Sequence, residues 1–319
     1  MLSQEIREKK LIFLRSLMDL MKKSHTHEQQ SQVIGDKDMV IPERFIAMVD
    51  AHILGNMLNI PHYPLILAIV GRPGMGKTYQ LRNYLNAVEI SIFSISSADL
   101  ESDRAGEPAK LLQQKYIEAS ASMSKGIPAV LLIDDIDTTL GEWENHTGTV
   151  NHQNILAFLM HIADNPHFIE NVGSVNRVPI FFTGNNFDRL YKPLIREGRA
   201  NRFDWEPTRE EKISIVTSIF SLESCKVAEM LVDLYPSEKI SFFTNLMVSK
   251  KIEQLSTLAN NVIFKYLLTN DNYRKELYSQ YCTMTKNIPW ELVVRENLCK
   301  NAQKDSNAQP PVGLEGDSD

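Results

Sequence analysis

Short apolar runs alternate with longer amphipathic stretches between residues 65 and 205. The apolar runs have few polar interruptions, which is typical of strands buried on both faces of a parallel sheet. We predict strands at Leu65–Val70, Ile90–Ile95, Ala129–Ile133, Val178–Thr183 and, shorter, Phe203–Trp205. The stretches between them have helical spacing near residues 76–86, 107–124 and 151–163. The pattern therefore predicts an α/β domain in which helices cover both faces of a five-stranded parallel sheet.

The pattern changes on either side of this region. Residues 1–37 combine an amphipathic helix, which could pack on the body or recognise a target, with a linker that lacks periodicity. A further helix is expected from Pro42, and after Pro207 the strand signal stops while helical spacing continues. We therefore predict an N-terminal helix and linker at 1–37, an α/β domain at 38–207, a small all-α domain at 208–303 and a disordered tail at 304–319.

The composition narrows the class of protein. Of the 319 residues, 43% are hydrophobic and 23% charged, as in an ordinary soluble globular protein. The net charge of −6 gives no electrostatic reason to expect nucleic acid as the main partner, and the three cysteines have no metal-type spacing. No apolar stretch approaches the ~20 residues of a membrane helix, and the charged start MLSQEIREKK argues against export. We expect a cytoplasmic protein, or a plastid-stromal one although no clear transit peptide is present, without membrane partners.

The strongest chemical signal lies directly after the first predicted strand. The segment has the pattern G-x-x-x-x-G-K-T and consists of Gly71, Arg72, Pro73, Gly74, Met75, Gly76, Lys77 and Thr78. Glycines let backbone N–H groups turn toward a triphosphate, and the N-terminus of the following helix favours negative charge. Lys77 can reach the β- and γ-phosphates, and the Thr78 hydroxyl suits Mg²⁺. An ordinary tight turn is the alternative, but the flanking strand and helix favour a phosphate-binding loop for ATP with Mg²⁺.

Two further strand ends carry polar side chains. The third predicted strand ends in Asp134 and Asp135, with Asp137 just beyond. Because carboxylates at this edge of the sheet would lie beside the phosphate loop, we assign Asp134 to Mg²⁺ and Asp135 to polarising the attacking water. Asp137 is expected to have a structural role. Asn185 follows the fourth strand and could hydrogen-bond the γ-phosphate and the water, although asparagine also commonly begins turns.

A group of arginines comes next. Arg196, Arg199 and Arg202 follow one another at intervals of three residues around Gly198. By itself such a group could be a solvated turn. Its position after Asn185 favours another role, because arginine stabilises charge on a phosphoryl group in transfer and is often supplied by a neighbouring subunit. We interpret Arg196 and Arg199 as candidate arginine fingers.

The phosphate loop, paired aspartates, strand-end asparagine and arginines, followed by a small helical domain, together resemble an AAA+ ATPase. Several segments resemble Rubisco activase in particular, and the similarity covers roughly residues 38–220. These segments are Pro64–Leu67, Leu100–Ser102, Ala105–Leu111, Ile162–Pro166, Arg177–Ile180, Thr183–Asn185, Leu190–Tyr191, Pro193–Arg196 and Glu206–Glu210.

This resemblance implies a P-loop NTPase fold whose small helical domain is a lid. It implies that ATP hydrolysis remodels a protein partner, which in this family means release of inhibitory sugar phosphates from Rubisco, and that the subunits form a ring, which we expect to be hexameric. Lys77 and Thr78 would bind phosphate and Mg²⁺, Asp134 and Asp135 would form the hydrolysis site, Asn185 would sense the γ-phosphate, and Arg196 and Arg199 would act across the ring interface. Residues 100–108 and 142–152 would line the central pore.

The chain also departs from the family. Arg72-Pro73 and Met75 replace the Gly-Lys and Gln that are usual in activases. Residues 1–37 do not resemble the plant N-terminal domain, no small-subunit-like C-terminal domain is expected, and no second-sensor arginine can be placed. The target is therefore left open. The alternatives are a non-Rubisco target, a nucleotide-gated assembly scaffold, and a DNA-associated AAA+ factor, which the net acidity disfavours.

Overall fold

The computed structural model describes residues 40–101, 104–140, 150–221, 225–259, 262, 264–286, 288 and 290. The chain divides into two compact units, one ending at Glu206 and the other beginning at Pro207. The predicted N-terminal helix and disordered tail lie outside the described residues. Within the described part of the chain, no helix combines the length and the apolar content needed to cross a membrane.

The first unit is built on a parallel sheet of five strands in the order β2-β3-β6-β1-β7. The strands are β1 (Ile66–Val70), β2 (Ser91–Ile95), β3 (Ala129–Ile133), β6 (Ile180–Gly184) and β7 (Ala200–Asp204). Strand β1 pairs with β6 on one side and with β7 on the other. The predicted five-stranded parallel sheet is therefore confirmed.

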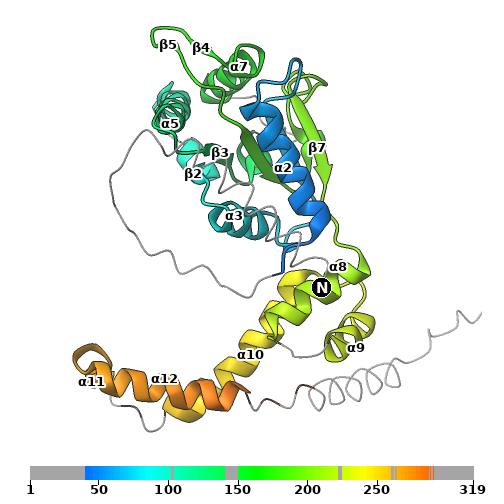
Figure 1. Ribbon diagram of the computed structural model, residues 1–319, viewed down its shortest axis with the longest axis vertical. Helices are drawn as coiled ribbons and strands as arrows, with labels where there is room; N and C mark the ends of the chain where they lie inside the picture. Colours follow the sequence, from blue (N-terminus) through cyan, green and yellow to red (C-terminus); the bar gives the residue numbers. More distant parts are fainter. Residues whose placement is uncertain are drawn as a thin grey trace, which may run out of the picture. The chain divides into compact units, whose positions relative to one another are not determined.

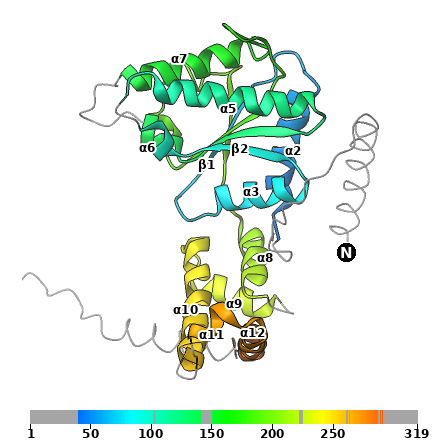
Figure 2. The ribbon, with the colours of Figure 1, turned by 90° about the vertical axis from the view of Figure 1, so that its left-hand side faces the viewer.

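Helices cover both faces of this sheet. They are α2 (Glu43–Met57), α3 (Lys77–Ala87), α5 (Glu107–Ser124) and α7 (Val150–Asp164). Helices α5 and α7 lie on one face, and α2 and α3 lie on the other (Figures 1 and 2). Neighbouring residues of β6 point to opposite faces of the sheet. Phe182 belongs to the core under α5 and α7, whereas the Phe181 ring packs edge-on against His52 of α2. The buried runs in the sequence are thus explained by burial from both sides.

Shorter elements complete the unit. They are α4 (Ser97–Leu100), α6 (Ile136–Leu140), the antiparallel pair β4 (Phe168–Ile169) and β5 (Gly173–Ser174), and the 3₁₀ helix η1 (Phe187–Arg189). Helix α4 begins with a capping box, in which the Ser96 hydroxyl accepts the Asp99 N–H and the Asp99 carboxylate accepts the Ser96 N–H. This helix buries Leu100 in the core, with 2% of the residue exposed. Pro108 is buried as well, so both ends of the predicted pore segment at residues 100–108 belong to the core.

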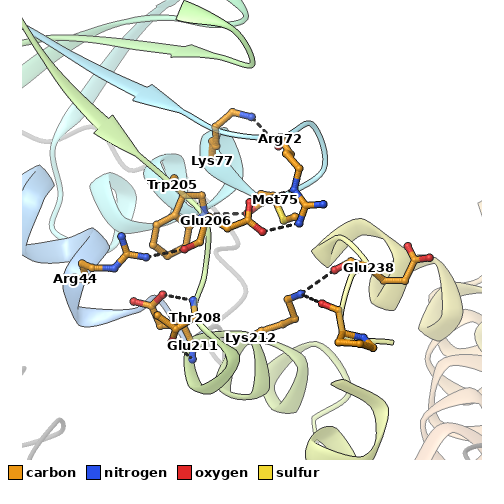
Figure 3. Close-up of polar contacts among 11 residues, drawn as sticks. Arg44, Arg72, Met75, Lys77, Trp205, Glu206, Thr208, Glu211, Lys212 and Glu238 are labelled. Atoms are coloured by element: carbon orange, nitrogen blue, oxygen red, sulfur yellow. Dashed lines mark hydrogen bonds and ion pairs between the residues drawn. The ribbon is translucent and has the colours of Figure 1, made fainter. Parts of the chain in front are cut away.

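The described residues of the second unit form helices joined by short connections, without a strand. Its helices are α8 (Arg209–Ile219), α9 (Lys226–Leu234), α10 (Ile240–Ala259), α11 (Phe264–Thr269) and α12 (Asp271–Lys286). A capping box between Thr208 and Glu211 begins α8. The Lys212 ammonium donates to the carbonyls of Pro236 and Glu238, at 2.9 and 3.0 Å (Figure 3). The hydrophobic core of the second unit consists of Ile213, Val216, Phe220, Ala228, Leu231, Val232 and Phe243.

Candidate nucleotide-binding site

The phosphate loop connects β1 to α3 at the carboxyl edge of the sheet. Lys77 begins α3, and only 6% of the residue is exposed. Its ammonium donates to the carbonyls of Gly71 and Arg72, at 2.6 and 3.1 Å, and to Oδ1 of Asn185 at 2.9 Å. Residues that are 108 positions apart in the sequence are thus in direct contact. The structure places the predicted strand-end amide beside the predicted phosphate-binding lysine.

Thr78 joins the loop to the acidic end of β3. Its hydroxyl donates to Asp134 Oδ1 at 2.6 Å. The hydroxyl of Thr183, near the end of β6, donates to the same carboxylate oxygen and accepts the N–H of Asp135 at 3.1 Å. Arg82 of α3 lies 3.9 Å from the other oxygen of Asp134. The sequence prediction missed Thr183, although a hydroxyl near the end of an otherwise apolar strand was a signal.

Asp135 and Asp137 differ in their surroundings. Asp135 is exposed and has φ = 49°, a left-handed conformation that aspartate tolerates better than most residues. Asp137 is buried, and one of its oxygens accepts the backbone N–H groups of Asn185 and Asn186, at 2.9 and 2.8 Å. Asp137 therefore fixes the turn that carries Asn185, which is a structural role.

The charges of this edge influence one another. Desolvation, and then the nearby carboxylates of Asp134 and Asp137, raise the pKa of Asp135, while Lys77 opposes the shift. Desolvation also lowers the pKa of Lys77, against the pull of the three aspartates. A carboxylate with a raised pKa is a better proton acceptor than an ordinary aspartate, so Asp135 is suited to general-base chemistry.

These residues fit a nucleoside triphosphate with a divalent cation. Gly74 and Gly76 have φ of 81° and 78°, so the loop uses backbone conformations that a side chain would strain. Among the described residues no three His, Cys, Asp or Glu side chains converge as a metal cluster. A phosphate-loop cation needs no such cluster, because a hydroxyl and one carboxylate suffice when phosphate oxygens and water supply the other ligands. Thr78 and Asp134 are the pair that would hold it.

The far side of the phosphate loop meets the end of β7. Arg72 forms a two-pronged ion pair with Glu206, with nitrogen–oxygen distances of 3.2 and 2.6 Å. The indole Nε1–H of Trp205 donates to the Met75 carbonyl at 3.0 Å. Figure 3 shows both contacts, which tie the loop to the last residues before the second unit. Sequence reasoning missed these contacts, since nothing in the pattern pairs residue 72 with residue 206.

The arginine segment lies at the opposite edge of the sheet. The Ile66 N–H, at the start of β1, donates to the Arg199 carbonyl at 3.1 Å, whereas the phosphate loop follows the end of β1. At ~3.3 Å per residue, this five-residue strand separates the two edges by about 16 Å. The structure therefore does not bring Arg196 and Arg199 to the phosphate loop of their own chain.

The two arginines are held differently. The Arg199 guanidinium donates a hydrogen bond to each carboxylate oxygen of Asp164, and its third nitrogen donates to the Pro193 carbonyl at 2.7 Å. Only 11% of its side chain is exposed, compared with 61% for Arg196, whose guanidinium lies 4.0 Å from Asp164. Arg199 is committed within the chain, and Arg196 is presented to solvent.

The predicted pore segments are partly described. Residues 102–103 and 141–149 lie outside the described residues. Of the rest, Asn151 accepts the Gly106 N–H at 2.7 Å and donates to the Arg104 carbonyl at 3.2 Å. The residues just before α5 are therefore hydrogen-bonded to the start of α7.

Comparison with known proteins agrees with this geometry. Residues 67–207 match the family model of the ATPase family associated with various cellular activities (AAA). Curated relatives include a ribulose bisphosphate carboxylase/oxygenase activase of Nostoc sp. strain PCC 7120, 43% identical over 65% of this chain and 52% of the relative. The chloroplastic activase of Spinacia oleracea is 39% identical over 70% of this chain and 50% of the relative. The chain spans about half the length of the curated relatives it matches.

The parallel sheet and the family match identify residues 67–207 as a domain of the AAA type. The chain is similar to Rubisco activases, at identities of about 40% over 65–70% of its length. The resemblance that the motifs suggested is confirmed.

Proposed function

We propose that this protein hydrolyses ATP with the help of Mg²⁺. The observation that carries the proposal is the convergence of Lys77, Asn185 and the Thr78–Asp134 pair at one edge of the sheet. These side chains come from the loop after β1 and from the ends of β3 and β6, and together they form the set that phosphoryl transfer to water requires.

Each residue has a distinct role. Lys77 and the N-terminus of α3 bind the phosphates, and Thr78 and Asp134 hold the cation, which would neutralise charge on the transferred group. Asp135 accepts the proton of the attacking water. Asn185 directs Oδ1 toward Lys77, so its Nδ2–H group is the one that can donate to a phosphate oxygen.

We further propose that the active site is completed by a second copy of the chain. This is supported by the separation of about 16 Å between the arginine segment and the phosphate loop of one chain, at ~3.3 Å per residue. Arg196 is the finger that reaches the neighbour's nucleotide, because it is exposed. Arg199 holds the segment in place through Asp164. A closed ring, expected to be hexameric, satisfies every such interface.

The similarity to activases supports a protein target. The relatives carry the name of ribulose bisphosphate carboxylase/oxygenase activase, so Rubisco is the first candidate for remodelling. The exposed residues Glu101 and Arg104 would face that target in a central pore. Because cyanobacterial and chloroplastic activases match at similar identities, 43% and 39%, cytoplasm and plastid stroma are both candidate settings.

The test compares wild type with Asp135→Asn. We expect the variant to bind ATP as tightly as wild type and to lose turnover, because the phosphate contacts stay and the proton acceptor is removed. A fluorescent ATP analogue measures binding, and phosphate release measures turnover. Equal turnover in the two proteins would refute the assignment. The trapped Asp135→Asn protein, incubated with ATP and purified Rubisco, then tests the target: co-elution of the two supports Rubisco, and separate elution at equal ATP occupancy refutes it.

A further inference from the structure

Trp205, the residue after β7, contacts the phosphate loop near both of its ends. Its backbone N–H donates to the Val70 carbonyl at 2.6 Å. Its carbonyl lies so close to Gly71 that a Cβ at that position would be 2.2 Å from the oxygen. Its indole Nε1–H donates to the Met75 carbonyl at 3.0 Å. One residue outside the motif therefore fixes both the beginning of the loop and its last turn.

The contact with Met75 determines how a peptide group is oriented. In a trans peptide the carbonyl and the following N–H point in opposite directions. Because the Met75 carbonyl points at the indole, the Gly76 N–H points away from it. In a loop of this class, N–H groups just before the lysine turn toward the phosphates. The indole thus selects the orientation in which the Gly76 N–H is available to an anion.

The indole itself is held in place. Trp205 is completely buried, and the Phe45 ring meets it edge-on with centroids 4.9 Å apart. The Arg44 guanidinium lies 4.9 Å from the Trp205 ring centroid, and its Nη2 donates to the Glu206 carbonyl at 2.9 Å (Figure 3). Helix α2 therefore contributes packing around the indole, while the hydrogen bond to Met75 is made by the indole alone.

We propose that Trp205 is a positioning residue for nucleotide binding, which acts by holding the Met75–Gly76 peptide in its phosphate-binding orientation. This inference rests on the proposed nucleotide site. It assigns the effect to the buried indole hydrogen bond and not to the neighbouring Arg72–Glu206 pair, in which both side chains are half exposed. Ion pairs with that exposure contribute little.

Three variants separate these contributions. Trp205→Phe keeps an aromatic ring but removes the donor to Met75. Phe45→Leu disturbs the same aromatic cluster without removing a hydrogen bond to the loop. Glu206→Gln removes the charge that faces Arg72. The dissociation constant for Mg²⁺–ADP is measured by calorimetry at a temperature at which circular dichroism shows every variant to be folded.

We expect Trp205→Phe to weaken ADP binding about tenfold, the effect of one buried hydrogen bond. Phe45→Leu and Glu206→Gln should stay within about threefold of wild type. Equal weakening by Trp205→Phe and Phe45→Leu would overturn the proposal, since packing alone would then explain the effect. Failure of wild type to bind ADP at all would instead refute the nucleotide site.

A second measurement works even if Trp205→Phe does not fold. In the double variant Trp143→Phe/Trp290→Phe, Trp205 is the only remaining tryptophan of the three in the sequence. We expect its emission to change with Mg²⁺–ADP, saturating at the calorimetric dissociation constant, because the peptide that accepts its hydrogen bond also meets the phosphate. The same protein with Lys77→Ala should show no change. Bound ADP without any change in emission would contradict the proposed contact.

Discussion

The two edges of the central sheet carry the same kinds of charge but organise them differently. At the carboxyl edge, Lys77 and Asp134 make their hydrogen bonds within the phosphate site. At the amino edge, Arg199 is bound to Asp164, while Arg196 leaves 61% of its side chain in solvent. At the first edge the charged groups are organised within the chain, as the proposed nucleotide site requires. At the second edge Arg199 is held within the chain and Arg196 is left in solvent, where we propose that it meets the nucleotide of a neighbouring subunit.

The largest effect is expected at the carboxyl edge. Lys77→Ala should abolish detectable ATP binding, because the ammonium that would reach the β- and γ-phosphates is lost and the carbonyls that it contacts would repel phosphate. Binding of a fluorescent ATP analogue measures this. Thermal unfolding should show a folded protein, since the lysine side chain contributes no apolar core. Binding at wild-type affinity would show that the loop does not cradle phosphate.

Arg196→Ala removes a charge at the amino edge of the sheet. It should lower ATP turnover while leaving ATP binding nearly unchanged. Loss of an arginine finger lowers the rate constant by 10³–10⁵ when the arginine carries transition-state charge. Because Arg196 lies far from its own phosphate loop, the affinity for ATP should stay within about threefold. Steady-state turnover and analogue binding, measured on the assembled protein, test this. A variant with full turnover would show that Arg196 is an ordinary solvated side chain.

The Asp164–Arg199 pair should have a smaller effect. Arg199→Ala and Asp164→Ala each free one partner of the same two-pronged contact, so each should lower turnover by about ten- to a hundredfold through misplacement of Arg196. The double variant should be no worse than either single variant, because both remove one interaction. If Arg199→Ala loses as much as Arg196→Ala while Asp164→Ala stays active, Arg199 is itself the finger.

The smallest effect is the pH dependence of turnover and of stability. It differs between the two edges because the pKa of Asp135 is raised and that of Asp164 is lowered. The pKa of Asp135 is raised by desolvation and neighbouring carboxylates, so this base is protonated at a higher pH than an ordinary aspartate. The Arg199 hydrogen bonds lower the pKa of Asp164, whose contribution to stability persists until the pH falls through that lowered value. Mild acid should therefore reduce turnover reversibly before it reduces the melting temperature. Turnover and melting that decline together would contradict this order.

Much of the fold could be read from the sequence because its strands are buried on both faces. The prediction for strand β7, Phe203–Trp205, starts too late and is too short. This strand is the outermost one on its side of the sheet, and its exposed residues Asn201 and Arg202 interrupt the apolar pattern. The two-residue strands β4 and β5 are too short for any periodicity to show. Helix α4 is only four residues long, and its one sequence signal is the capping box from Ser96 to Asp99.

The candidate site was predictable where a motif lies next to a strand end. Lys77, Thr78 and Asp134 follow directly from that rule, and the structure brings them together. The long-range contacts that hold the site residues in place were not predictable from the sequence. Trp205 meets Met75 across 130 positions of sequence, and Arg199 meets Asp164 across 35. Such contacts depend on the register between strands, which the pattern of single residues does not contain.

Mixing two inactive variants tests most directly whether the two edges belong to one shared active site. Lys77→Ala subunits keep Arg196 but cannot bind ATP, and Arg196→Ala subunits bind ATP but supply no finger. The account predicts that each is inactive alone, and that turnover returns on mixing with a maximum near equal amounts, because some interfaces then join an intact loop to an intact arginine. Co-assembly, shown by energy transfer between labelled subunits, without any return of turnover would contradict it.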